Sequence, residues 1–186
     1  MEAGAAGAEA TRAAMSHHEH KERAPKALAF ALLTVSDSRD EASDETGRTI
    51  RALLEAAGHT VVAYAVVRDE EADIRAAVES WLEGGAIQAV VLNGGSGVSP
   101  RDVTPEAVRL LLDKELPGFG ELFRTLSYQE IGAAAYLSRA FAGVARGKAV
   151  FCLPGSASAA ALAVERLILP EAGHLWAMAN EAKGGR

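Results

Sequence analysis

Residues that could bind an anion and a cation together lie close to one another in the middle of the chain. An apolar run at residues 88–92 leads into five small residues at 93–97, and Asp102 follows just before the helix-start sequence Thr104-Pro105-Glu106. Glycines let backbone N–H groups approach an anion closely, whereas a carboxylate beside such a nest needs a cation between the two. The stretch therefore predicts a site for a metal-bound nucleotide or phosphate ester.

The residue types alone leave two roles open for Asp102. An acid just upstream of Thr104 also interacts favourably with a helix dipole, so capping and catalysis are equally compatible with its position. The glycine loop is not a Walker loop, because no Gly-Lys-Ser/Thr follows it, and it does not have the GxGxxG spacing of a dinucleotide fingerprint. The loop thus indicates an anion without identifying it.

Three other short polar segments, residues 36–39, 68–70 and 154–156, lie where apolar runs of strand length end. Because the carboxyl ends of parallel strands share one edge of a sheet, we expect these segments to converge on the glycine loop. Asp69 and Asp102 are then the candidate carboxylates for Mg²⁺, which uses one or two of them together with substrate phosphate oxygens. At 36–39 a plain turn is an equally good interpretation, and at 154–156 an ordinary helix cap is preferred as long as that segment is taken alone.

Strand and helix patterns alternate along the chain, which predicts an α/β fold with a mostly parallel sheet and helices on both faces. The expected strands are residues 27–35, 60–67, 87–92, 140–145 and 149–153. The expected helices are residues 44–57, 73–82, 106–114, 119–132 and 156–169. Gly47 costs helix propensity in a first turn, which indicates a close approach by another group. Arg146-Gly147 predicts a hairpin between the last two strands.

Composition narrows the classes of function. The chain has 186 residues and a formal charge of -6, which fits one domain and argues against the basic patch of a nucleic-acid surface. Its one cysteine, Cys152, cannot form an intramolecular disulfide and lies in an apolar run, which is typical of a small buried residue. A single unpaired cysteine suits a reducing compartment, so we expect the protein in the cytoplasm.

The ends of the chain differ in composition from its middle. The predicted divisions are a disordered tail at residues 1–25, a single domain at 26–180 and a short tail at 181–186. No apolar run approaches the roughly 20 residues of a membrane helix, and the start lacks the apolar core of a signal peptide. The cluster His17-His18-Glu19-His20 could bind a stray metal ion, but without partner ligands a solvated tail is the preferred interpretation.

Several motifs in a fixed order resemble the molybdenum-cofactor biosynthesis family of the MoaB and MogA type, the molybdopterin adenylyltransferases. The motifs are LTVSDSR at 33–39, NGGSG at 93–97, PRDVTPEA at 100–107, PGFGELFR at 117–124, SYQEIG at 127–132, LSRAFAGV at 137–144 and FCLPGS at 151–156. Together they cover about residues 27–169, and an ordered set of motifs is far more specific than any one of them.

The resemblance implies a three-layer α/β domain that assembles as a homo-trimer, in some members paired into a hexamer. Active members use Mg-ATP to adenylate the phosphate of molybdopterin, release pyrophosphate and hand the product to a metal-insertion protein. The resemblance assigns catalysis to Asp102 and Asp69, with Asp102 also holding Mg²⁺. The residues that it assigns to substrate binding, or that lie in its motifs, are Ser36, Asp37, Gly94, Gly95, Ser96, Gly97, Glu121, Ser138, Arg139, Pro154, Gly155 and Ser156.

Two departures from the family pattern are compatible with activity. Asn93 and Ser96 stand where threonines are usual, and the first helix begins Asp-Glu-Thr-Gly where an acid, a serine and a glycine are common.

The alternative functions are a non-catalytic molybdopterin-binding subunit of the same fold, a competence-damage-type deamidase or pyrophosphatase, and a dinucleotide oxidoreductase. Because Asp102 is present, an active adenylyltransferase is the preferred hypothesis, whether molybdenum or tungsten is the final metal.

Overall fold

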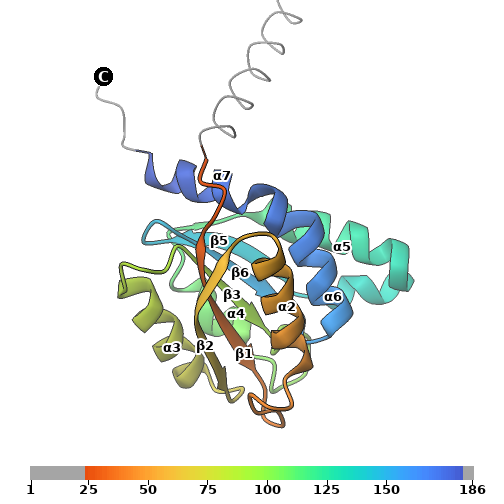
Figure 1. Cartoon of the computed structure of the whole chain (residues 1–186). Coiled ribbons are helices and arrows are strands. Elements are labelled where there is room, and N and C mark those ends of the chain that lie inside the picture. Colours follow the sequence, from red (N-terminus) through yellow and green to blue (C-terminus); the bar gives the residue numbers. More distant parts are fainter. Residues whose placement is uncertain (1–23, 182–186) are drawn as a thin grey trace, which may run out of the picture.

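The apolar runs of the sequence form one six-stranded sheet in the computed structural model, which describes residues 24–181 (Figure 1). The strands are β1 (Ala29–Val35), β2 (Thr60–Val67), β3 (Ala89–Asn93), β4 (Lys114–Glu115), β5 (Phe141–Ala145) and β6 (Lys148–Leu153). The helices are α2 (Glu45–Ala56), α3 (Glu71–Glu83), α4 (Thr104–Arg109), α5 (Pro117–Ile131), the 3₁₀ helix η1 (Gly132–Leu137), α6 (Ala157–Ala163), the π-helix η2 (Val164–Ile168) and α7 (Leu169–Asn180). Most of the two predicted tails, with the histidine cluster, lies outside the described residues.

The sheet has the strand order β2-β1-β3-β6-β5-β4. The first four strands in this order run parallel, and β5 and β4 add antiparallel pairs, which confirms the mostly parallel sheet. Thr34 pairs with Asn93, which pairs in turn with Leu153, so the carboxyl ends of β1, β3 and β6 lie in register at one edge. The predicted hairpin is confirmed, with Arg146 and Gly147 both at positive φ in its turn.

Helices cover both faces of the sheet, which makes the fold a three-layer α/β arrangement as predicted. Alternate side chains of β1 face opposite cores: Phe30 and Leu32 pack on the side of α2, α5, α6 and α7, and Ala31 and Leu33 pack on the side of α3 and α4. Cys152 lies fully buried in the second core, where burial raises the pKa of its thiol well above the ordinary value. It is the small buried residue that the sequence predicted.

The helix predicted at residues 106–114 is wrong in its second half. α4 begins at Thr104 and ends at Arg109, and the chain then enters β4. The N–H of Asp113 donates to Val144 O and that of Leu116 donates to Ala142 O, each over 2.8 Å. Pairing with β5 thus takes up the backbone groups that a longer helix would have used.

The helix predicted to end at Leu169 continues to Asn180 as α6, η2 and α7 without a break. Pro170 lies in the first turn of α7, directly after the π-helical turns of η2. A π-helical segment shifts the hydrogen-bond register, which accommodates a residue that has no N–H of its own. None of the helices within residues 24–181 is long and apolar enough to cross a membrane.

Candidate active site

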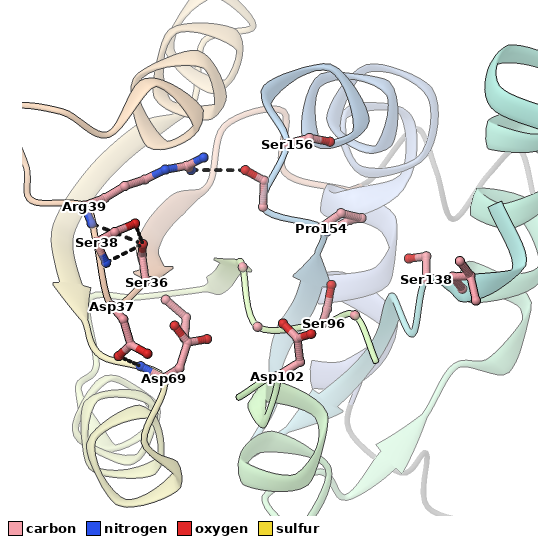
Figure 2. Close-up of a pocket in the computed structure, with 16 residues that line it drawn as sticks. Ser36, Asp37, Ser38, Arg39, Asp69, Ser96, Asp102, Ser138, Pro154 and Ser156 are labelled. Carbon is pink, nitrogen blue, oxygen red and sulfur yellow. Dashed lines mark hydrogen bonds between the residues drawn. The ribbon is translucent and has the colours of Figure 1, made fainter. Parts of the chain in front are cut away.

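A crevice opens where β1 and β3 lie side by side with their following helices on opposite faces of the sheet. α2, which follows β1, packs on the core of Phe30, whereas α4, which follows β3, packs on the core of Ala31. Loops that diverge in this way leave a ligand-sized gap beyond the carboxyl ends of the strands. A cavity of about 650 Å³ occupies that position (Figure 2).

The cavity brings together all four polar segments that the sequence singled out. Its lining consists of Val35, Ser36, Asp37, Ser38, Arg39, Asp69, Gly94, Gly95, Ser96, Gly97, Asp102, Leu137, Ser138, Pro154, Gly155 and Ser156. Both candidate catalytic acids are in this set, with most of the residues expected to bind substrate. Glu121 and Arg139 are not.

The glycine loop after β3 is folded so tightly that two positions exclude a side chain. Gly94 and Gly95 have φ of +97° and +59°, and a Cβ on Gly95 would lie 2.4 Å from Thr104 Oγ1 and 2.8 Å from Asp69 Oδ1. Thr104 closes the loop, because its hydroxyl donates to Gly94 O over 2.8 Å and its N–H donates to Gly95 O over 3.0 Å. The glycines therefore let the backbone pass directly beside Asp69.

Asp102 does not cap α4 by a hydrogen bond. The N-cap position is Val103, and the helix has no side-chain cap bond. Asp102 instead closes the preceding turn: its Oδ2 accepts from Ser99 N over 2.7 Å, and its own N–H donates to Ser99 O over 2.9 Å. A Cβ on Gly97 would lie 3.0 Å from Asp102 Oδ2, so this carboxylate lies against the glycine loop. The catalytic alternative for Asp102 thus keeps its geometric basis.

Of the three acids that line the cavity, only Asp37 has a cationic partner among the described residues. The carboxylate of Asp37 accepts bonds of 2.9 to 3.0 Å from Arg101, which also pairs with Glu70. Burial raises the pKa of Asp69, and the negative charges of Asp37 and Asp102 raise it further. The charge of Arg101 acts on the pKa of Asp69 in the opposite sense, but Arg101 forms no ion pair with Asp69. Asp69 and Asp102 thus leave negative charge in the cavity that no ion pair within residues 24–181 neutralises.

That charge fits a divalent cation only if a ligand completes the coordination. Within residues 24–181 no group of three or more His, Cys, Asp or Glu side chains is placed to hold a metal ion. Mg²⁺ commonly takes one or two carboxylates and completes six-fold coordination with water and phosphate oxygens. Asp69 and Asp102 supply the first part of such a set, beside a loop with the space for the second.

A buried acid, Asp44, supports the other side of the cavity. It caps α2 by accepting from Gly47 N over 2.9 Å, and it also accepts from the hydroxyls of Thr34 at 2.5 Å and Tyr64 at 2.6 Å. Burial alone would raise the pKa of Asp44, but these bonds and the nearby charge of Arg39 outweigh it and lower the pKa. Asp44 is therefore an ionised anchor for the loop after β1.

Gly47 shows the close approach that the sequence indicated, since a Cβ there would lie 2.1 Å from Asp44 Oδ2. The sequence does not reveal the role of Asp44 in the site, because there it is only one of several acids at a helix start. Asn93 extends the same network by donating to Thr34 Oγ1 over 2.8 Å.

Arg139 lies beside the cavity rather than in its lining. Its Nε donates to Gly97 O and its Nη2 donates to Asp102 O, each over 2.6 Å, and its Nη1 forms an ion pair with Glu106. It thus ties together the two ends of the segment from Gly97 to Asp102. These contacts give the guanidinium a structural role beside the cavity, and the expectation that Arg139 binds substrate stays a prediction.

Glu121 is an exposed residue of α5 outside the cavity lining. The motif PGFGELFR contributes instead through packing: a Cβ on Gly120 would lie 2.7 Å from Ala140 O, so the helix passes close to the segment that leads into β5. Ser138, at the start of that segment, does line the cavity.

Comparison with known proteins places the fold and the cavity in a family. The sequence profile described as a probable molybdopterin binding domain matches residues 31–174. The chain belongs to this family. Every residue that lines the cavity lies within the matched range, so the cavity is part of the family domain and not an addition to it.

Relatives of this molybdopterin-binding family are similar over nearly their whole length. Molybdenum cofactor biosynthesis protein B of Halalkalibacterium halodurans is 52% identical over 166 residues, covering 87% of this chain and 95% of that protein. The protein of the same name from Bacillus subtilis is 48% identical over 162 residues, covering 87% and 95%. The family resemblance read from the sequence motifs is confirmed.

Solved structures with these family names share the fold. A crystal structure of molybdenum cofactor biosynthesis protein B is 45% identical with a TM-score of 0.82, covering 86% of this chain and all of that one. A tungsten cofactor synthesizing protein, MoaB from Pyrococcus furiosus, is 37% identical with a TM-score of 0.77, covering 85% and 100%. Relatives named for either metal thus have the same architecture.

Proposed function

We propose that this chain is a molybdopterin adenylyltransferase, which uses Mg-ATP to adenylate the phosphate of molybdopterin and releases pyrophosphate. One observation carries the proposal: Asp69 and Asp102, two carboxylates without a cationic partner among the described residues, face one cavity beside a tight glycine loop. Membership of the molybdopterin-binding family supplies the pterin as the substrate.

In the reaction, an oxygen of the molybdopterin phosphate attacks the α-phosphorus of ATP. A P–O bond forms there, and the bond to the bridging oxygen of the β-phosphate breaks, so that pyrophosphate leaves. Such transfers depend on positioning and charge neutralisation more than on covalent work by the protein. Mg²⁺ would neutralise negative charge on the phosphate oxygens when bound.

The residues of this chain divide that work. Asp102 would hold Mg²⁺, with Asp69 as a second ligand or as the group that orients the bound phosphate. The loop around Gly94 and Gly95 would place backbone next to the phosphates, and the hydroxyls of the cavity lining would add hydrogen bonds; these belong to Ser36, Ser96, Ser138 and Ser156. A homo-trimer or hexamer and hand-over to a metal-insertion protein complete the proposal.

The test measures pyrophosphate released from Mg-ATP and molybdopterin by the wild type and by Asp102→Asn. The variant keeps the size of the side chain but removes its charge, so we expect turnover to fall by about 10²- to 10³-fold while pterin binding is largely retained. Turnover near the wild-type level in the variant would contradict the role of Asp102. A wild type that binds molybdopterin but releases no pyrophosphate would instead be the non-catalytic binding subunit.

A further inference from the structure

One cationic side chain, Arg39, lines a cavity whose other charged residues are acids. The charged members of the lining are Asp37, Asp69, Asp102 and Arg39. In Figure 2, Arg39 lies along one edge of the cavity and extends toward the segment that holds Pro154 and Ser156, while Asp69 and Asp102 lie at the opposite edge. The cavity is therefore divided between a side that attracts cations and a side that attracts anions.

The guanidinium of Arg39 is fixed by only one of its nitrogens. Nη1 donates to Thr46 Oγ1 and to Gly155 O, each over 3.1 Å, and lies 3.9 Å from the buried carboxylate of Asp44. Neither Nε nor Nη2 has a bond to a residue in the described part of the chain. Arginine carries five N–H donors in a rigid fork, so the unused edge keeps three of them.

Thr46 holds this arrangement in place. Its hydroxyl accepts from Arg39 and donates to Gly155 O over 2.8 Å, and the threonine itself is buried at the start of α2. The side chain of Arg39 is 37% exposed and lines the cavity, so a ligand in the cavity can reach this residue. Ser156, the neighbouring cavity residue at the N-cap of α6, does not use its hydroxyl to cap that helix.

We propose that Arg39 binds a terminal phosphate group through Nε and Nη2, on the side of the cavity away from Asp69 and Asp102, and without a divalent cation. A guanidinium fork matches two phosphate oxygens, and its charge replaces the metal that the acidic side requires. The inference rests on the proposed function, which supplies two phosphate carriers, molybdopterin and ATP. It adds a cation-independent phosphate subsite that is distinct from the metal-dependent one.

The experiment measures the binding of molybdopterin and, separately, of ATP, each in Mg²⁺ and in EDTA, for the wild type and Arg39→Gln. We expect one of the two ligands to bind the wild type in EDTA, and Arg39→Gln to weaken that ligand about 10- to 100-fold in both conditions. The ligand affected identifies which phosphate lies at Arg39. Arg51→Gln removes the same charge from the exposed face of α2 and should leave both affinities unchanged.

Two further variants separate ligand binding from support of the loop. Arg39→Lys keeps the charge without the fork and should restore part of the affinity, which a purely structural role would not predict. Thr46→Val removes the hydroxyl that orients Arg39 and should weaken the same ligand by less than Arg39→Gln does. Thermal unfolding of each variant confirms that it is folded.

The outcomes distinguish this inference from the proposed function. Pyrophosphate release by the wild type, together with unchanged phosphate affinities in Arg39→Gln, would overturn the subsite and leave adenylation standing. Binding in EDTA that depends on Arg39, together with no pyrophosphate release, would support the subsite and reject adenylation. A wild type that binds neither ligand without Mg²⁺ would overturn the subsite as well.

Discussion

At the scale of single residues, the acids around the cavity divide by whether other groups of the protein already stabilise their negative charge. Asp37 is paired with Arg101, and Asp44 is saturated by hydroxyl and N–H donors beneath the surface. Asp69 and Asp102 have no ion pair with a residue of the range 24–181, and their mutual repulsion is part of the reason that the pKa of Asp69 is raised. A ligand that brings a cation relieves that repulsion, which makes these two the acids of the proposed site.

Gly95 gives a test at the same scale. In Gly95→Ala the new methyl group would meet Thr104 Oγ1 and Asp69 Oδ1, in a backbone conformation with φ of +59° that side chains rarely adopt. We expect a loss of about 1–3 kcal/mol of unfolding free energy from the strain and a loss of nucleotide binding because Asp69 is displaced. Urea unfolding and calorimetric titration with Mg-ATP measure the two effects.

Gly85→Ala is the matched control, since Gly85 is an exposed loop glycine with open space around its Cα and no positive φ. It should leave both measurements at their wild-type values. Nucleotide affinity unchanged in Gly95→Ala would show that the tight turn is not part of the binding site.

At the scale of elements, the sequence predicted the strands well because buried parallel strands are nearly continuous apolar runs. The run at 27–35 became β1, and the run at 149–153 became β6. The helix predicted at 106–114 failed because its apolar residues were equally compatible with the turn after α4 that leads into β4. Periodicity describes which residues are buried, but the partner strand decides which hydrogen bonds form.

In the site too, features set by nearby sequence could be predicted, whereas contacts between residues far apart in the chain could not. The meeting of the four polar segments at one edge of the sheet could be predicted. Each segment lies at the carboxyl end of a strand, and the carboxyl ends of parallel strands share one edge. The roles of Arg39 and Arg139 could not be predicted, since each is set by carbonyls far away in the chain, Gly155 O for Arg39 and Gly97 O for Arg139. An arginine in a motif indicates charge near the site without saying which groups it binds.

Arg139 gives the test at the scale of elements, because it joins the glycine loop to the segment before α4. Arg139→Gln removes donors to both Gly97 O and Asp102 O, so Asp102 should lose its fixed position. We expect pyrophosphate release to fall by about 10- to 100-fold, since misplacement of about 1 Å can cost as much, with only a modest loss of thermal stability.

Glu106→Gln is the comparison for Arg139, because it weakens only the ion pair at Nη1 and leaves both carbonyl bonds in place. Its effect on turnover should be clearly smaller. Equal effects of the two variants would mean that the charge pair, rather than the link between the two carbonyls, positions Asp102.

At the scale of the whole molecule, topology explains why the cavity has two electrostatic sides. The chain leaves β1 toward one face of the sheet and leaves β3 toward the other. Arg39 therefore arrives with the loop that leads to α2, and Asp102 arrives with the loop that leads to α4. Arg101 and Asp37 pair where the two loops meet, but Arg39 and Asp102 form no ion pair with each other. The crevice between the loops can therefore keep a cationic and an anionic group, which suits a reaction between two phosphates of which one is bound with a metal.

The stability of the whole fold should depend on pH through His59, which lies buried between α2 and β2. Its Nδ1 accepts from Leu28 N over 3.1 Å, and burial lowers its pKa below the ordinary histidine value of about 6.5. The neutral ring is therefore the folded form. As the pH falls through about 6.5, His59 of the unfolded chain gains a proton that His59 of the folded protein does not. The free energy of unfolding should therefore decrease with falling pH, until the pH reaches the lower pKa of His59 in the folded protein.

Urea unfolding of the wild type and His59→Asn between pH 5 and pH 8 measures this contribution. Asparagine can place an acceptor oxygen where Nδ1 lies but does not titrate, and its smaller side chain loses the contact with Phe30, whose ring centroid lies 5.1 Å away. We therefore expect the variant to be less stable at pH 8 but to lose less stability than the wild type on acidification. The acids around the cavity titrate in both proteins, so their effect cancels in the difference between the two free energies of unfolding. If that difference did not change with pH, the lowered pKa of His59 would not contribute to the pH dependence of stability.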